Sequence, residues 1–317
     1  MTKMHEALRS SVGVTVAITT YNHARFLADA LDSIVGQSNE PDEILVVDDG
    51  SEDNPAAVVD RYPGVRLLRQ SNQGIAAARN TALREAAHPR ILFLDADDVL
   101  RPRALELSMA CFERHLDAGF VYGGHVMVDA ELKPISVSHF EATGPDPYLD
   151  FLAGNTIGMH ATVLYDREKL EDIGGFDPEL DRCEDYDVFL RMSRRFDVGH
   201  HPDAVALYRM HGENMSGDSL VMLRWAEHVH GLARERGLSS REELRAWRRG
   251  RRRWRSYYAA THVYQHRDAP LGRRLRAVMA AARIAPLTLV RRALIAARRR
   301  TPTPLSTLLR KVTGRSG

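Results

Sequence analysis

Short apolar runs alternate with helical patterns over the first hundred residues of this chain. The apolar runs are rich in β-branched and aliphatic residues and lie at residues 14–20, 43–47, 65–68 and 91–94. Apolar residues at helical spacing occupy residues 24–37, and an alanine-rich helical segment occupies residues 74–87. Apolar strands that alternate with helices are typical of a parallel sheet with helices on both faces. The alternation therefore predicts an α/β fold built on a mainly parallel sheet.

Polar residues cluster where three of these predicted strands end. The clusters are TTYN at residues 19–22, DDGS at residues 48–51 and DADD at residues 95–98. In open α/β sheets, ligands bind beyond the carboxyl ends of the strands. Packing of the core does not require polar clusters at all three places, so these strand ends are the candidate site.

The DADD cluster brings three carboxylates, Asp95, Asp97 and Asp98, to one strand end. Like charges at such distances repel one another unless a cation or a basic group neutralises them. Divalent cations such as Mg²⁺ take oxygen ligands and often keep positions for substrate phosphates. One interpretation is a metal ion that bridges the protein to a diphosphate. The other is a solvated loop in which Asp98 caps the next helix.

Two further motifs are ambiguous when taken alone. Asp49 either belongs to an ordinary strand-to-helix turn or accepts hydrogen bonds from a ribose or a base. Gly74 begins a helix whose second turn carries Arg79. Because a helix start favours anions, Arg79 is a candidate contact for a phosphate.

In their order along the chain, the motifs resemble those of family-2 glycosyltransferases with the GT-A fold. The resemblance rests on TTYN, VVDDGS, NQGIAAARN and FLDADD, and continues in GGFD at 174–177, CEDYD at 183–187 and YRMHGENMS at 208–216. It covers about residues 12–217 and implies a GT-A, Rossmann-like sheet. We therefore expect a catalytic domain over residues 1–217 and a basic helical region over residues 218–317.

The resemblance also implies roles for individual residues. The nucleotide and donor sugar would contact Thr19, Tyr21, Asn22, Asp49, Arg79, Asp95 and Ala96. Asp95, Asp97 and the late His211 would hold Mg²⁺ or Mn²⁺, and Asp185 would be the catalytic base. Glu184 and His160 are weaker candidates for contacts with the acceptor, since a helix-start charge or a structural histidine explains them equally well.

These roles describe the transfer of a sugar from a nucleoside-diphosphate donor to an acceptor hydroxyl. An unperturbed aspartate has a pKa of about 3.9, so Asp185 would accept the proton during attack and not before it. One base opposite one leaving group implies inversion at the anomeric carbon. We expect a UDP-sugar donor and a role in cell-surface polysaccharide or glycolipid biosynthesis.

Two alternative functions stay open at this point. The first is a catalytically silent scaffold that binds a nucleotide or a membrane. The second is a sugar-nucleotide pyrophosphorylase, which would carry a glycine-rich phosphate loop after the first strand, where this chain has TTYNHARF. Release of a nucleoside diphosphate would distinguish a transferase from both.

Charge divides the chain into two unlike parts. Residues 1–219 hold 20 Lys and Arg against 37 Asp and Glu, whereas residues 220–317 hold 24 against 5. The basic part has helical patterns at residues 220–237, 241–262, 271–285 and 287–300, and arginines surround Trp254 at residues 248–255. Such a region could contact an anionic membrane surface, an acidic protein surface or nucleic acid. We favour the membrane, because many acceptors of such enzymes are lipid-linked, and expect no nucleic acid.

The remaining features concern the cellular location. Two cysteines do not form a disulfide framework, the first residues lack the apolar core of a signal peptide, and no apolar run reaches the roughly 18 residues of a membrane span. We therefore expect a cytoplasmic protein, peripheral on the inner face of the cell membrane.

Overall fold

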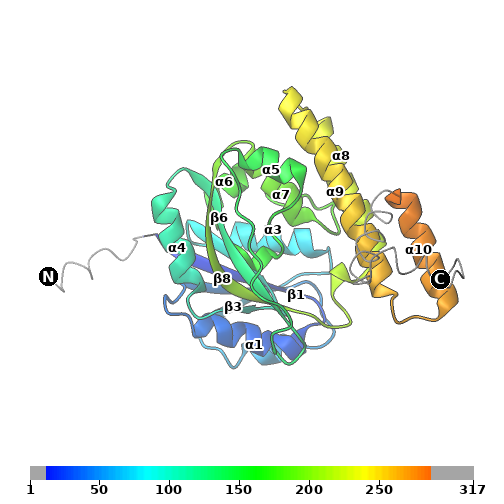
Figure 1. The fold of residues 1–317 in the computed structure, drawn as a ribbon. Coiled ribbons are helices and arrows are strands. Elements are labelled where there is room, and N and C mark those ends of the chain that lie inside the picture. The colour runs from blue at the N-terminus through cyan, green and yellow to red at the C-terminus, as the bar shows by residue number, and fades with distance from the viewer. Residues whose placement is uncertain (1–11, 287–317) are drawn as a thin grey trace, which may run out of the picture. The chain divides into compact units, whose positions relative to one another are not determined.

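The computed structural model describes residues 12–286 and shows a mixed sheet of eight strands (Figure 1). The strand order is β3-β2-β1-β4-β7-β6-β8-β5. The strands are β1 (Val14–Thr20), β2 (Glu43–Asp48), β3 (Val65–Arg69), β4 (Arg90–Asp95), β5 (Val99–Leu100), β6 (Ala118–Val128), β7 (Val163–Asp166) and β8 (Asp197–Arg209). The described residues therefore confirm the predicted α/β fold.

Helices connect most of these strands and form the later part of the described chain. They are α1 (Ala24–Val35), α2 (Ala56–Val59), α3 (Ile75–Glu85), α4 (Ala104–Arg114), α5 (Pro147–Ala153), α6 (Arg167–Asp172), α7 (Glu184–Ser193), α8 (Ser219–Glu235), α9 (Arg241–Gln265) and α10 (Leu271–Ile284). Three of the four predicted basic-region helices correspond to α8, α9 and α10. The fourth, at residues 287–300, lies outside the described residues.

The first four strands of the order are parallel and end together. Thr19 is level with Val47 on β2 and with Asp95 on β4, and Thr20 is level with Asp48. The three polar clusters therefore meet at one edge of the sheet, as predicted. Beyond β4 the sheet is mixed, because β7 runs antiparallel to both β4 and β6. Four of the seven strand pairings are parallel, which agrees with the predicted mainly parallel sheet. The other three are antiparallel, and an apolar strand pattern does not reveal that direction.

Alternating side chains of each strand pack on opposite faces of the sheet. Val16, Ile18 and Leu94 join a core formed with α1 and α4. Phe93 points to the other face, where its ring lies 5.1 Å from the ring of Phe176, and an aromatic cluster continues to Phe189 on α7. Both faces are covered, which explains why the central strands are apolar on both sides.

The chain forms two compact units, Met1–Gly217 with Arg224–Arg251, and Asp218–Leu223 with Arg252–Gly317. These units divide the chain differently from the boundary expected after residue 217. The first unit includes much of α8 and α9, because Trp247 Nε1 donates to the carbonyl of His230, 2.7 Å away, and His230 Nε2 lies 2.8 Å from the carbonyl of Leu152 on α5. At Gly250 a β-carbon would lie 2.1 Å from that same carbonyl oxygen, so only glycine allows this close packing.

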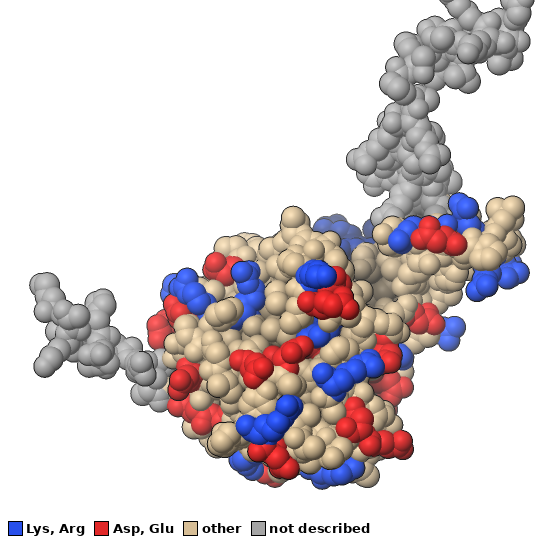
Figure 2. All heavy atoms as spheres, turned by 90° about the horizontal axis from the view of Figure 1, so that it is seen from below, with Lys and Arg blue, Asp and Glu red and all other residues tan. Residues whose placement is uncertain are grey.

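Acidic and basic side chains are interspersed over the face seen in Figure 2. On this face, the coloured acidic and basic side chains therefore do not separate into one acidic and one basic patch. Within the described residues, no helix is both long enough and apolar enough to cross a membrane.

Candidate functional site

The ends of β1 and β4 are joined directly by Thr19 and Asp95. Thr19 Oγ1 donates to Asp95 Oδ1 over 3.2 Å, and the Ala96 amide donates to the Thr19 carbonyl over 3.1 Å. The structure thus brings together three of the residues expected to bind the donor. Thr19 and Ala96 are buried, whereas the Asp95 side chain is about one-third exposed.

Asp49 organises the loop that leads into α3. Its carboxylate accepts hydrogen bonds from Gln70 Nε2 at 2.8 Å and from the amides of Gln73 and Gly74, each at 2.9 Å. Gly74 has φ +88°, which glycine adopts at little cost. Asp49 is buried, and its three hydrogen bonds fix the conformation of this loop. A carboxylate can accept about four hydrogen bonds, so Asp49 can still accept one from a ligand.

Tyr21 and Asn22 form the loop after β1. Asn22 has φ +57°, its amide donates to Ser51 Oγ, and its Oδ1 accepts from the Glu52 amide, both at 2.9 Å. The side chain of Asn22 thus ties this loop to the turn after β2. Tyr21 is 48% exposed, so its ring is accessible for stacking on a flat ligand such as a nucleotide base.

Arg79 is an internal counterion, which differs from the predicted phosphate contact. It is 2% exposed, its Nη2 lies 2.8 Å from Asp95 Oδ1, and its Nη1 pairs with Glu184. Burial alone would lower the pKa of Arg79, but the charges of Asp95 and Glu184 raise it. The sequence could not reveal this, because Glu184 is 105 residues away along the chain.

Asp97 and Asp98, two of the three carboxylates of the DADD turn, have different environments. Asp98 is buried and accepts from the Arg209 amide at 2.9 Å, and burial together with the charges of Asp97 and Asp95 raises its pKa well above the usual range. Asp97 Oδ2 lies 2.9 Å from His211 Nε2. The structure therefore unites Asp97 with the late histidine, as expected, and gives Asp98 a structural hydrogen bond to β8.

His23 completes a group that the sequence analysis missed. Its Nδ1 lies 3.8 Å from Asp97 Oδ2, and the ligand atoms of His23, Asp97 and His211 all lie within 4.8 Å of one another. A signal was present, because His23 directly follows TTYN at the end of a strand. Asp95 is not part of this group, since its Oδ1 faces Thr19 and Arg79.

The first turn of α7 carries the predicted base. Cys183, just before it, has φ +61°, a left-handed conformation that non-glycine residues seldom adopt. Asp185 is half-buried, and its Oδ1 accepts from the Tyr186 amide at 2.6 Å. Burial raises the pKa of Asp185, against the lowering effect of Arg79. A raised pKa brings a carboxylate closer to the value that suits a general base near neutral pH.

Neither neighbouring acid on α7 faces solvent. Glu184 is buried beside Arg79, and burial outweighs that guanidinium and raises the pKa of Glu184 to about 7. Asp187 is fully buried between Arg236 and Arg191, whose Nε lies 2.7 Å away. The acceptor contact considered for Glu184 is therefore not supported, because its carboxylate is used to hold Arg79.

His160 lies in the aromatic cluster under the sheet. It is 5% exposed, its Nε2 is 2.8 Å from the Tyr165 hydroxyl, and its ring stacks on Phe93 at 5.6 Å. Burial lowers its pKa well below the usual range, so the ring is neutral. The structure thus favours the structural interpretation of His160 over a contact with the acceptor.

The GGFD segment is fastened to α3 beside Arg79. Asn80 accepts from the amide of Phe176 at 2.8 Å and donates to its carbonyl at 2.7 Å. Gly175 has φ +67°, and a β-carbon there would lie 2.6 Å from Asn80 Oδ1. Helix α3 therefore positions Arg79, which lies between Asp95 and Glu184, and through Asn80 it also holds the GGFD segment that precedes α7.

Residues 15–174, half of the chain, match the family model described as Glycosyl transferase family 2. The chain belongs to this family. A curated relative is an uncharacterized glycosyltransferase, alr2836, of Nostoc sp., which is 30% identical over 240 residues. That alignment covers 69% of this chain and 72% of the Nostoc protein.

Two longer relatives are polysaccharide synthases by name. Chondroitin synthase of Escherichia coli is 30% identical over 211 residues, which are 64% of this chain and 30% of that protein. Hyaluronan synthase of Pasteurella multocida is 30% identical over 211 residues, which are 21% of its length. This family 2 chain therefore spans less than a third of either synthase.

Solved structures show the same GT-A fold. S. aureus TarS 1–349, in complex with UDP-GlcNAc, has a TM-score of 0.65 at 20% identity, over 86% of this chain and 82% of the TarS 1–349 chain. Mannosyltransferase PcManGT of Pyrobaculum calidifontis, in complex with GDP-Man and Mn²⁺, has a TM-score of 0.60 at 22% identity, over 93% and 82% of the two chains. Both agree with the GT-A fold implied by the motifs of this family 2 chain.

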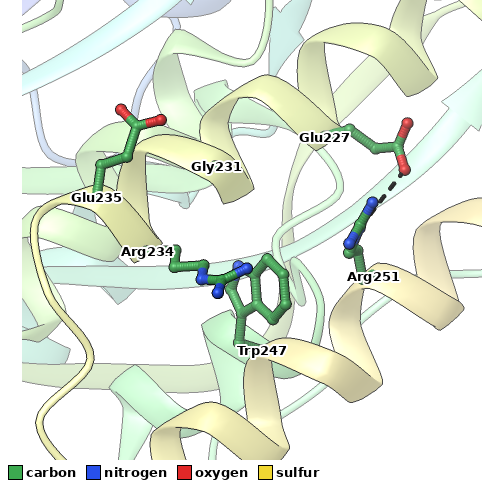
Figure 3. Close-up of a pocket in the computed structure, with 6 residues that line it drawn as sticks. All are labelled: Glu227, Gly231, Arg234, Glu235, Trp247 and Arg251. Atoms are coloured by element: carbon green, nitrogen blue, oxygen red, sulfur yellow. Dashed lines mark ion pairs between the residues drawn. The ribbon is translucent and has the colours of Figure 1, made fainter.

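A pocket of about 500 Å³ lies elsewhere, on α8 and α9 (Figure 3). The guanidinium of Arg234 lies 5.0 Å from the centre of the Trp247 ring, and Arg251 pairs with Glu227 at 3.9 Å. Its lining residues are Glu227, Gly231, Arg234, Glu235, Trp247 and Arg251, none of which belongs to the family 2 motifs. The pocket is therefore separate from the strand-end site.

Proposed function

We propose that this protein transfers a sugar from a nucleoside-diphosphate donor to an acceptor hydroxyl with inversion, with Asp185 as the general base. The observation that carries the proposal is the ion-pair chain from Asp95 through Arg79 to Glu184. It connects the donor motif at the end of β4 to the helix start that bears Asp185. Asp185, the proposed base, directly follows Glu184, so the ion-pair chain supports a position near the leaving diphosphate.

Different residues at the strand ends would contact different parts of the donor. The exposed ring of Tyr21 would stack on the base, and the loop shaped by Asp49 would hold the nucleoside. Arg79 orients Asp95 and leaves the phosphates to other groups, since it is buried and paired. Asp185 would accept the hydroxyl proton as the new bond forms.

A divalent cation fits the donor set of this site. Asp97, His211 and His23 offer one carboxylate and two imidazoles within 4.8 Å of one another. When bound, such a cation would stabilise the negative charge that develops on the departing diphosphate. That PcManGT is described with Mn²⁺ supports a cation in this fold.

The donor is proposed to be a UDP-sugar, and the product a cell-surface polysaccharide or glycolipid. TarS is described with UDP-GlcNAc, and two relatives are named as synthases of chondroitin and hyaluronan. Family membership disfavours the pyrophosphorylase alternative. Release of a nucleoside diphosphate from a donor would exclude the catalytically silent scaffold.

A donor screen tests this function on the full chain. Thermal unfolding is followed with UDP, dTDP and GDP, each with and without Mn²⁺ or Mg²⁺. A ligand present at about 100 times its Kd should stabilise the folded state by about 2.7 kcal/mol, and we expect UDP with the cation to give the largest shift. Nuclear magnetic resonance of the product's anomeric proton then reports inversion. Binding of UDP without release of UDP from any donor and acceptor pair would instead support the scaffold.

We also propose that the second unit contacts an anionic membrane surface. Within it, Ala281 of α10 and Ala285 pack against Ala259 of α9. Another face of α10 exposes Leu271, Leu275 and Val278, which are 69%, 55% and 43% exposed. Exposed arginines occupy the same helix at positions 273, 274 and 276. An exposed apolar stripe beside basic residues is typical of helices that lie in a membrane interface.

Point substitutions on α10 test this contact. The double variant Leu271→Ser, Leu275→Ser should bind vesicles with anionic lipid at least about tenfold more weakly, because each buried leucine contributes about 1.5–3 kcal/mol. The control variant Val35→Ser, Leu116→Ser removes two exposed apolar side chains from the first unit and should bind as the parent does. Co-sedimentation with vesicles measures both, and equal binding by all three proteins would contradict the contact.

A further inference from the structure

We propose that His23 is a ligand of the divalent cation together with Asp97 and His211, and that this set selects Mn²⁺ over Mg²⁺. The inference rests on the proposed function, because it names the cation of the same site. Neither the motifs nor the comparisons assign a role to His23. Three loops supply the three side chains, after β1, β4 and β8, so the group exists only in the folded chain.

The distances converge on one carboxylate oxygen. Asp97 Oδ2 lies 2.9 Å from His211 Nε2 and 3.8 Å from His23 Nδ1. The two imidazole rings meet edge to face, with centroids 5.6 Å apart. Nitrogen and oxygen atoms at these separations are close enough for one cation to contact all three after small shifts of the side chains.

Contacts outside the group hold the ligands in place. Arg209 Nε donates to the Asp97 carbonyl at 2.9 Å, which fastens the DADD turn to β8 just before His211. The Phe26 ring lies 4.9 Å from the ring of His211 and 5.9 Å from that of His23. These contacts limit the movement of the DADD turn and of the two imidazole rings.

The side chain of His23 does not cap the helix that it precedes. It is the residue before α1, yet its side chain makes no capping hydrogen bond, and 24% of that side chain is exposed. A helix of this kind is ordinarily capped by Ser, Thr, Asp or Asn. An imidazole here is therefore not explained by the start of the helix.

The donor chemistry determines the preferred ion. Mg²⁺ favours oxygen ligands in near-ideal octahedral geometry and loses water reluctantly. Imidazole nitrogen favours first-row transition metals, so two imidazoles and one carboxylate raise the preference for Mn²⁺ over Mg²⁺. If His211 coordinates the cation through Nε2, its Nδ1 carries the proton. Nδ1 then cannot accept the 3.3 Å hydrogen bond from the Glu213 amide, so this hydrogen bond would be lost on binding.

Mn²⁺ binding to the full chain tests the inference without measuring turnover. The loss of the electron paramagnetic resonance signal of free Mn²⁺ is titrated for the parent, His23→Ala and the exposed-histidine control His115→Ala. Affinity of His23→Ala for Mn²⁺ should fall about tenfold to a hundredfold, with His115→Ala unchanged. Competition with Mg²⁺ should show that His23→Ala loses less affinity for Mg²⁺ than for Mn²⁺, so that its preference for Mn²⁺ is smaller than that of the parent.

A second variant keeps the test decisive if alanine perturbs the loop. His23→Asp places a favoured capping residue before α1 and exchanges a nitrogen ligand for oxygen, which should shift preference toward Mg²⁺. Parent-like Mn²⁺ affinity and selectivity in both variants would overturn the role of His23 alone. A parent chain that binds no Mn²⁺ and releases UDP equally fast in a chelator would overturn the inference and also the metal dependence of the proposed function. If the parent releases UDP normally with a cation and the His23 variants bind Mn²⁺ as the parent does, the inference about His23 is wrong and the proposed function stands.

Discussion

The Asp185→Asn variant is expected to lose about 10²- to 10⁴-fold in kcat, with donor binding unchanged. Asparagine matches the shape of aspartate and can still accept the hydrogen bond from the Tyr186 amide, but it cannot take up the proton of an acceptor hydroxyl. Release of UDP measures kcat, and thermal unfolding with UDP reports donor binding. The exposed Asp181→Asn, four residues earlier, is the matched control and should keep parental activity.

The base assignment also predicts the direction of the pH profile. A general base acts in its unprotonated form, so kcat should rise with pH as Asp185 titrates and then level off. Because burial raises the pKa of Asp185, the midpoint should lie above the ordinary value of about 3.9. This rise should be missing from the residual activity of Asp185→Asn. Full activity in that variant would show that another group accepts the proton.

The Arg79→Met variant is expected to lose about 3–5 kcal/mol in free energy of unfolding. Methionine fills much of the buried space but leaves Glu184 and Asp95 without their counterion. Urea unfolding measures the loss. Arg84→Met, on the same helix but exposed, should change stability by less than about 0.5 kcal/mol.

Two further measurements identify the cause of this loss. Burial already raises the pKa of Glu184 to about 7, so protonation at pH 5 should remove its charge and reduce the loss relative to pH 8. The double variant Arg79→Met, Glu184→Gln should recover part of the stability, because no unpaired charge remains at residue 184. An equal loss at both pH values, with no recovery, would point to packing of the arginine stem.

Much of the site could be placed from the local pattern alone. Thr19, Asp49 and Asp95 lie at or just beyond the ends of apolar strands. Parallel strands bring their carboxyl ends to one edge, as the level pairing of Thr19 with Asp95 shows. The helix start at Glu184 could likewise be found from its motif. These predictions succeed because strand period and turn chemistry act over a few residues.

Other assignments depended on neighbours that are distant along the chain. Arg79 is expected at a phosphate when it is considered alone, yet Glu184 and Asp95 hold it inside. His160 is equally plausible at a surface or in a core, and only the packing of Phe93 and Tyr165 around it decides. His23 follows the TTYN motif directly, but a single histidine indicates a metal site only when Asp97 and His211 lie beside it in the folded chain.

The amino-acid sequence by itself determined the α/β fold, the family motifs and the edge of the sheet at which they meet. The tertiary structure alone decided which polar side chains face a ligand and which are internal partners. It also assigned residues 224–251 to the first unit, through the packing of Trp247 and Gly250 beside α5. The physical reason is range: hydrophobic periodicity and turns are local, whereas burial and charge pairing depend on residues brought together only when the chain folds.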